Sequence, residues 1–308
     1  MPHPTPFSLT PGEIKTAADR IATHVRPVTV AQTSPGLFLA LEFMQHTGSF
    51  KARGAMNFLL AHREAGLLPE AGLTIASGGN AGLACAWAAR EHGVRATVFL
   101  PETAPPVKVA RLRSYGADVR LTGTRYDEAR AACEEFATTS GALASHAYDH
   151  PLIAAGAGTL TEEILRRVPG GLDTLVVSVG GGGLFAGVAT AALDKGIEVV
   201  AVEPENCRAL NAALAAGRVV DSAVDSVAAD SLGATRVSEA ALTVARREGV
   251  RSVLVPDEAI VRARQQLWDE HRLAVEHAAA TAHAYAPKPG ERAAIVLCGA
   301  NTGLGDLT

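Results

Sequence analysis

The chain has 308 residues, of which 48% are hydrophobic and 19% are charged, and its formal net charge at pH 7 is −4. This length and composition predict a globular protein of about two domains and exclude a disordered tail or a small disulfide-stapled scaffold. The 28 basic residues are balanced by 32 acidic ones without a basic cluster, so we expect no nucleic acid and no membrane as partner.

Cysteine usage and hydropathy point to the same compartment. No stretch approaches the roughly 18 apolar residues of a membrane span, and residues 1–6 do not begin a signal sequence. The cysteines form neither a CxxC pair nor a Cys/His cluster and are widely spaced: Cys85, Cys133, Cys207 and Cys298. We therefore expect a cytoplasmic protein without a structural metal.

The first elements lead to a lysine at a turn. Thr10 is placed to cap an amphipathic helix over residues 11–25, and residues 37–43 are typical of a short strand. Gly48-Ser49-Phe50-Lys51 then precedes a strongly helical stretch over residues 52–65. Lys51 is thus predicted at a strand-to-helix turn.

From residue 72 short apolar strands alternate with Ala-rich helices, an order typical of a parallel sheet covered on both faces. The predicted strands are 73–76, 96–100, 118–121 and 142–145, and the predicted helices are 81–92, 106–115 and 126–139. A second series follows Pro151, with helices 156–167 and 185–193 and strands 175–179, 199–202 and 293–297. The fold class is therefore α/β with two mainly parallel sheets. Residues 1–70 and 148–308 are expected to form a large domain and residues 71–147 a small mobile one.

Four consecutive glycines, Gly180 to Gly183, lie between an apolar strand and a helix. Backbone N–H groups at such a helix start bind phosphate. One frame, residues 181–186, also satisfies G-x-G-x-x-A, and Glu203 ends the next strand about 20 residues on, as a dinucleotide site requires. At this point a nicotinamide-dependent oxidoreductase remains an alternative.

Lys51 is one of only five lysines in the chain. A desolvated amine with a lowered pKa at an element boundary forms imines readily, and Phe50 could wall its pocket. A second polar loop comprises Ser77, Gly78, Gly79, Asn80 and Ala81 and is placed to hold a carboxylate at a helix start. Cys298 follows the last predicted strand. A single cysteine is more often a small buried core residue than a functional one.

Four motifs in this order closely resemble the serine/threonine dehydratase family of fold-type II pyridoxal phosphate enzymes, which includes serine racemase and, more distantly, cysteine synthase. The resemblance covers nearly the whole chain. The motifs are GSFKARGA at 48–55, SGGNAG at 77–82, GGGGL at 180–184 and CGAN at 298–301. The resemblance to this family implies pyridoxal 5'-phosphate as cofactor, a tryptophan synthase β-like fold and a homodimer.

The resemblance also assigns roles. Lys51 would carry the cofactor as a Schiff base and act as catalytic base, with Ser77 as the second catalytic candidate and Phe50 against the cofactor. Asn80 would hydrogen-bond the ring hydroxyl and Cys298 would face the ring nitrogen, where a neutral thiol favours expulsion of a β-leaving group. The phosphate would be held by Gly180, Gly181, Gly182, Gly183 and Leu184.

Two departures from the family pattern narrow the expected activity. Gly78 stands where the family's racemases carry a serine that serves as acid/base opposite the lysine, which favours elimination over racemisation. Cys207 and Ala209 stand where a second metal-binding carboxylate would follow Glu203, so no strong metal site is expected. We expect conversion of a β-hydroxy amino acid such as L-serine or L-threonine to a 2-oxo acid and ammonia. β-Replacement and racemisation on the same fold remain alternatives.

Overall fold

A computed structural model describes residues 7–303, 305 and 307 of the protein, and residues 1–6, which are not expected to begin a signal sequence, lie outside the described residues. The larger of its two sheets contains, in order across the sheet, β1 (Val30–Ser34), β2 (Leu37–Ala40), β10 (Ala293–Val296), β7 (Thr174–Ser178), β8 (Glu198–Pro204) and β9 (Val250–Val255). β1 pairs antiparallel with β2, and every other neighbouring pair is parallel.

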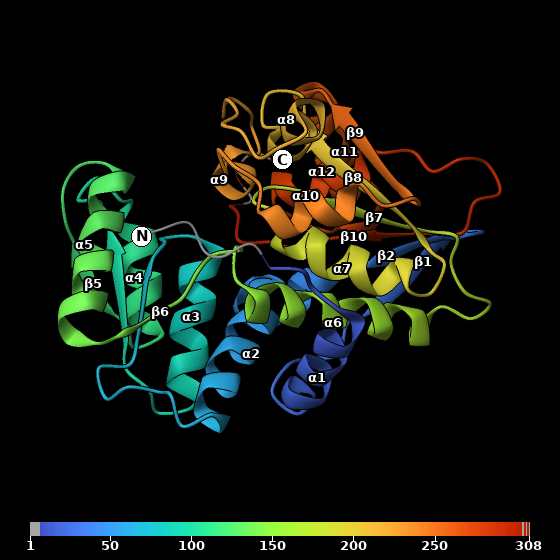
Figure 1. Cartoon of the computed structure of the whole chain (residues 1–308). Coiled ribbons are helices and arrows are strands. Elements are labelled where there is room, and N and C mark those ends of the chain that lie inside the picture. Colours follow the sequence, from blue (N-terminus) through green and yellow to red (C-terminus); the bar gives the residue numbers. More distant parts are fainter. Residues whose placement is uncertain (1–6, 304, 306, 308) are drawn as a thin grey trace.

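The smaller sheet is parallel throughout and contains, in order, β5 (Asp118–Leu121), β4 (Ala96–Leu100), β3 (Leu73–Ala76) and β6 (Leu143–Ala144). Its helices are α3 (Asn80–Glu91), α4 (Pro106–Ser114) and α5 (Tyr126–Ser140). Figure 1 shows this green and cyan group beside the larger group of elements. The two largely parallel sheets, each with its helices, confirm the predicted α/β class.

Three helices lie between and below the sheets in Figure 1, namely α1 (Pro11–Ile21), α2 (Lys51–Glu64) and α6 (Pro151–Arg167). α2 packs against both α3 and α6, so it touches both groups of elements. The remaining helices cover the larger sheet: α7 (Gly183–Leu193), α8 (Ala209–Ala216), α9 (Ala229–Leu232), α10 (Glu239–Ala245), α11 (Asp257–His271) and α12 (His277–His283). Short 3₁₀ turns, η1 (Glu42–Met44) and η2 (His46–Gly48), precede α2.

The observed boundaries agree with local sequence signals and depart from them for local reasons. Thr10 and Glu13 form the capping box that begins α1. The strand expected over residues 37–43 ends at Ala40, because η1 turns the backbone away. α6 begins five residues earlier than predicted, since His150 caps it and Pro151 suits a first helical position.

Each sheet has its own apolar core. One cluster surrounds the larger sheet, and the second joins β3, β4 and α3 to α2, which contributes Met56 and Phe58. All four cysteines are buried and unpaired. None of the helices in the residues that the structure covers is long and apolar enough to cross a membrane. The limits of the two predicted domains are not decided by these features and stay a prediction.

Candidate active site

A cavity of about 970 Å³ opens between the two sheets at the carboxyl ends of β3, β4 and β7. Parallel sheets place ligands at this edge because loops from several strands converge there. Every site residue predicted above lies in its wall: Phe50, Lys51, Ser77, Gly78, Gly79, Asn80, Ala81, Gly180, Gly181, Gly182, Gly183, Leu184 and Cys298. Residues more than 240 positions apart in the sequence therefore share one cavity.

Lys51 is the first residue of α2, and its side chain extends into the cavity. Its Nζ donates a hydrogen bond to the carbonyl oxygen of Ala147 at 2.6 Å and lies 4.7 Å from the centre of the Phe50 ring. Burial lowers the pKa of Lys51 to about 8, partly opposed by the nearby Cys298 and Glu276. An amine in this pKa range is available as nucleophile and base near neutral pH.

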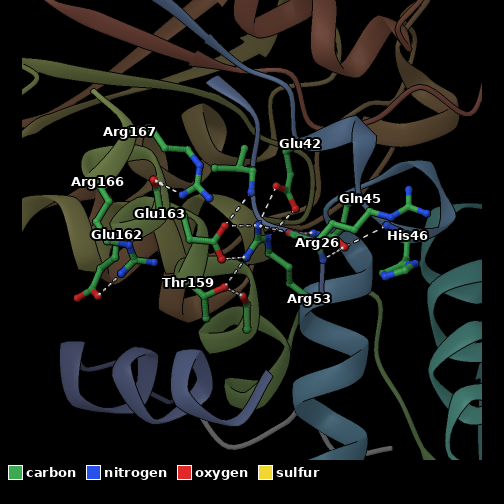
Figure 2. Close-up of polar contacts among 12 residues, drawn as sticks. Arg26, Glu42, Gln45, His46, Arg53, Thr159, Glu162, Glu163, Arg166 and Arg167 are labelled. Carbon is green, nitrogen blue, oxygen red and sulfur yellow. Dashed lines mark hydrogen bonds and ion pairs between the residues drawn. The ribbon is translucent and has the colours of Figure 1, made fainter. Parts of the chain in front are cut away.

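A buried ionic cluster contacts the first turn of α2 through Arg53, two residues after Lys51 (Figure 2). The guanidinium of Arg53 is fully buried and donates to Glu42 Oε1 at 2.6 Å, Glu163 Oε1 at 2.7 Å and Thr159 Oγ1 at 3.1 Å. Burial raises the pKa of Glu42 despite the neighbouring cation. Burial also opposes ionisation of Glu163, yet hydrogen bonds from Arg53 hold its pKa below the ordinary value. The cluster joins η1, α2 and α6 and holds the helix that carries the lysine.

The glycine loop runs from Gly180 to the first residue of α7, Gly183. Gly182 has a φ of +92°, and a Cβ there would lie 2.4 Å from the Cβ of Ala241. A Cβ on Gly181 would overlap the ring of Tyr148 at 2.3 Å. These glycines are therefore required by backbone conformation and by close packing. The first residues of α7, Gly183 and Leu184, line the cavity directly after this turn.

Glu276 is a site residue that the sequence analysis passed over. Its carboxylate is 5% exposed and accepts hydrogen bonds from Asn80 Nδ2 at 3.0 Å, Ser231 Oγ at 2.9 Å and the backbone N–H of Asn301 at 2.8 Å. Asn301 Nδ2 donates in turn to Asn80 Oδ1 at 2.5 Å. Both ends of the Asn80 amide are thus engaged, which orients this side chain in the wall. The signal that could have identified Glu276 in the sequence is an acidic residue in a segment whose residues 275 and 278 are apolar.

Cys298 follows β10 and is 4% exposed. Its Sγ lies 3.7 Å from Ser178 Oγ, at the end of the adjacent strand β7. Burial, with the nearby Glu276, raises the pKa of the Cys298 thiol to about 12. The thiol is therefore neutral at physiological pH and offers a weak donor or acceptor, not a charge.

Ala147 and Tyr148 also line the cavity, in a turn from His146 to Asp149 that the sequence did not point to. His146 Nδ1 accepts from the backbone N–H of Asp149 at 2.8 Å and of Tyr148 at 3.3 Å. Burial and the nearby Lys51 lower the pKa of His146 to about 4, so the ring is neutral and keeps accepting. Tyr148 donates its hydroxyl to the carbonyl oxygen of Arg236 at 3.2 Å. The turn thereby presents the carbonyl of Ala147 to Lys51.

Glu203 does not have the position that a dinucleotide site requires. It is fully buried, and its carboxylate accepts from the backbone N–H groups of Leu210 at 2.7 Å and Asn211 at 2.8 Å, at the start of α8. Burial raises its pKa to about 7. Within residues 7–303, 305 and 307 no group of three His, Cys, Asp or Glu side chains is arranged to hold a metal ion.

The family model of pyridoxal-phosphate dependent enzymes matches residues 21–299, and the chain belongs to this family. This membership excludes the nicotinamide alternative. Among curated proteins, "Serine dehydratase-like" of Rattus norvegicus is 40% identical over 252 residues, covering 80% of this chain and 75% of that protein. "L-threonine ammonia-lyase" of Geobacter sulfurreducens is 34% identical over 276 residues, covering 87% of this chain and 68% of that protein.

Solved structures of two activities resemble this chain to a similar degree. The structure of maize serine racemase has a TM-score of 0.88 at 28% identity and covers 98% of this chain and 96% of that one. The structure of a threonine deaminase from T.th. has a TM-score of 0.84 at 31% identity and covers 96% of this chain and 99% of that one. The predicted fold-type II architecture is confirmed, but backbone similarity does not separate elimination from racemisation.

The residues present fit pyridoxal phosphate. The cavity combines a buried amine on Lys51, a glycine turn at a helix start, and a neutral thiol on Cys298. These groups match the three chemically distinct parts of the cofactor: an aldehyde, a phosphate and a ring nitrogen. The residues that line the cavity are therefore sufficient to bind the cofactor of this family.

Proposed function

We propose that the protein is an ammonia-lyase that converts L-serine, L-threonine or a similar β-hydroxy amino acid to a 2-oxo acid and ammonia. The observation that carries the proposal is the shared cavity of Lys51, with a pKa of about 8, and Cys298, with a neutral thiol. The 40% identity to a protein named "Serine dehydratase-like" supports the same substrate class.

Pyridoxal phosphate, when bound, supplies an electron sink for the bonds broken at the substrate. In this proposal Lys51 carries the cofactor, and Nζ afterwards removes the substrate's α-proton. The loop of Gly180, Gly181, Gly182, Gly183 and Leu184 would hold the phosphate, and the Cys298 thiol would serve the ring nitrogen without adding charge. Phe50 packs against the ring beside the lysine.

The loop before α3 is proposed to bind the substrate carboxylate. Ser77, Gly79 and Ala81 line the cavity at the start of a 12-residue helix, where backbone amides and the helix dipole favour an anion. Asn80 is held in place by Glu276, so its position does not depend on the substrate. Gly78 contributes no proton donor, which favours elimination over racemisation.

The test is a panel of D- and L-amino acids scored separately for 2-oxo acid and ammonia. We expect equal amounts of both products from one enantiomer of serine or threonine. Lys51→Ala should lose at least about 10³ in rate, because it removes both the covalent link and the base. Consumption of O-acetylserine only when a nucleophile such as sulfide is added, without release of 2-oxo acid or ammonia, would favour β-replacement. Interconversion of enantiomers without 2-oxo acid would favour a racemase.

A further inference from the structure

Leu100 occupies the space next to Gly78. It is the last residue of β4, is 3% exposed, and lines the same cavity as Gly78. A Cβ on Gly78 would lie 2.8 Å from Leu100 Cδ2, and the next nearest atoms, at 3.6 and 3.8 Å, also belong to Leu100. A Cβ on the following residue, Gly79, would have no atom within 4 Å. The restriction is therefore specific to position 78 and comes from one side chain.

Leu100 can make room only by leaving its packed position. It belongs to the buried cluster that includes Ile75, Leu83 and Leu112, so movement into the core would overpack that cluster. Movement in the other direction would take its methyl groups into the cavity that the substrate occupies. In either direction Leu100 leaves its packed position in the cluster, so we expect a larger residue at position 78 to lower the stability of the fold.

The wall that continues from Leu100 is mainly apolar. Pro101, Ala104, Pro105 and Val107 line the cavity with it, whereas Thr103, Lys108 and Arg111 are the polar residues that line the cavity from the same stretch. Lys51 reaches the cavity from a different element, the start of α2. The site therefore has a base on one element and a largely apolar wall on another.

We propose that Leu100 determines reaction specificity by filling the space of a side chain at position 78 and thereby keeping a proton donor out of that position. The proposal rests on the elimination function proposed above and deepens it. Glycine at position 78 removes the donor, and Leu100 prevents a serine from restoring it without a second change. Gly78→Ser alone, the substitution that the sequence suggests as a route to racemisation, should fail for this reason.

The first test measures stability without cofactor and so does not depend on activity. Gly78→Ser should lower Tm by about 2–6 °C through overpacking, and Leu100→Val in the same chain should recover much of that loss. Val has the β-branched shape that suits a strand, and it withdraws the clashing methyl group. The pair Gly79→Ala and Leu100→Val is the matched control, and its two shifts should add. Additive shifts for Gly78→Ser and Leu100→Val as well would overturn the proposal.

The second test follows deuterium incorporation at the α-carbon of both enantiomers of serine in deuterated water, with the holoenzyme. Gly78→Ser alone should leave enantiomer conversion within about threefold of the parent. The double variant should raise it by about 10², the lower range for a positioned acid or base. Equal gains in the single and double variants, or no gain in the double variant, would overturn the proposal. Failure of the parent to form 2-oxo acid would instead refute the elimination function, and the stability cycle would still decide the role of Leu100.

Discussion

Replacing Arg53 with methionine tests how the buried ionic cluster supports α2. The parent guanidinium is fully buried and contacts both oxygens of Glu42, at 2.6 and 3.1 Å, and both oxygens of Glu163, at 2.7 and 3.1 Å. Methionine fills most of the volume but leaves two carboxylates facing each other, with side chains 1% and 14% exposed. Removing one partner of a buried ion pair costs about 3–5 kcal/mol of unfolding free energy.

The cost should depend on pH in a defined direction. Without Arg53, burial and mutual repulsion raise the folded-state pKa of Glu42 and Glu163 above their unfolded values. The folded variant then binds more protons than the unfolded chain, so its stability falls as pH rises through these values. In the parent, Glu163 has a lowered pKa and contributes stability that is lost as pH falls. The raised pKa of Glu42 acts in the opposite direction, and it is common to parent and variant. The difference between parent and variant should therefore narrow from pH 8 to pH 5.

Urea unfolding of the cofactor-free protein, followed by circular dichroism at both pH values, measures this difference. Glu42→Gln is expected to cost only about 1–2 kcal/mol, because Arg53 keeps Glu163 as its partner. Arg130→Met is the surface control: Arg130 pairs with Glu134 on α5, its side chain is 52% exposed, and the expected loss is below about 0.5 kcal/mol. A loss below about 1 kcal/mol for Arg53→Met, or a loss independent of pH, would refute the reasoning.

Three further outcomes follow from the site. Borohydride reduction of the holoenzyme and peptide mass spectrometry should find the pyridoxyl group on the peptide that contains Lys51, and labelling of another lysine would contradict the assignment. Gly182→Val should lower both cofactor occupancy and Tm, because its φ of +92° and the 2.4 Å approach to α10 do not admit a side chain; a variant with normal Tm and occupancy would disprove this. Asp230→Asn removes the 2.5 Å ion pair from α9 to Lys108 across the cavity mouth. It should change KM by less than about threefold at low salt and not at all at about 0.5 M salt, and a salt-independent change would refute an electrostatic origin.

The sequence by itself determined the class of fold and most of the site. Alternating strands and helices predicted two parallel sheets, and strands 96–100 and 118–121 were predicted with the bounds that the structure has. Lys51, Gly78 and Gly180 were each predicted at a turn that precedes a helix, and the structure brings them into one cavity. Local periodicity and turn chemistry are sufficient for this because both act over a few residues.

Only the tertiary structure decided which side chains complete that cavity. The insertion of β10 between β2 and β7 brings Cys298 next to Ser178, and periodicity carries no information on the order of strands in a sheet. Glu276 and Leu100 became site residues only when their distant partners were placed, since one is defined by its hydrogen bonds and the other by the space it fills. Burial of a charge such as Arg53 likewise depends on carboxylates 11 and 110 residues away. Interactions of this kind are set by packing between elements, which the local pattern of a sequence does not specify.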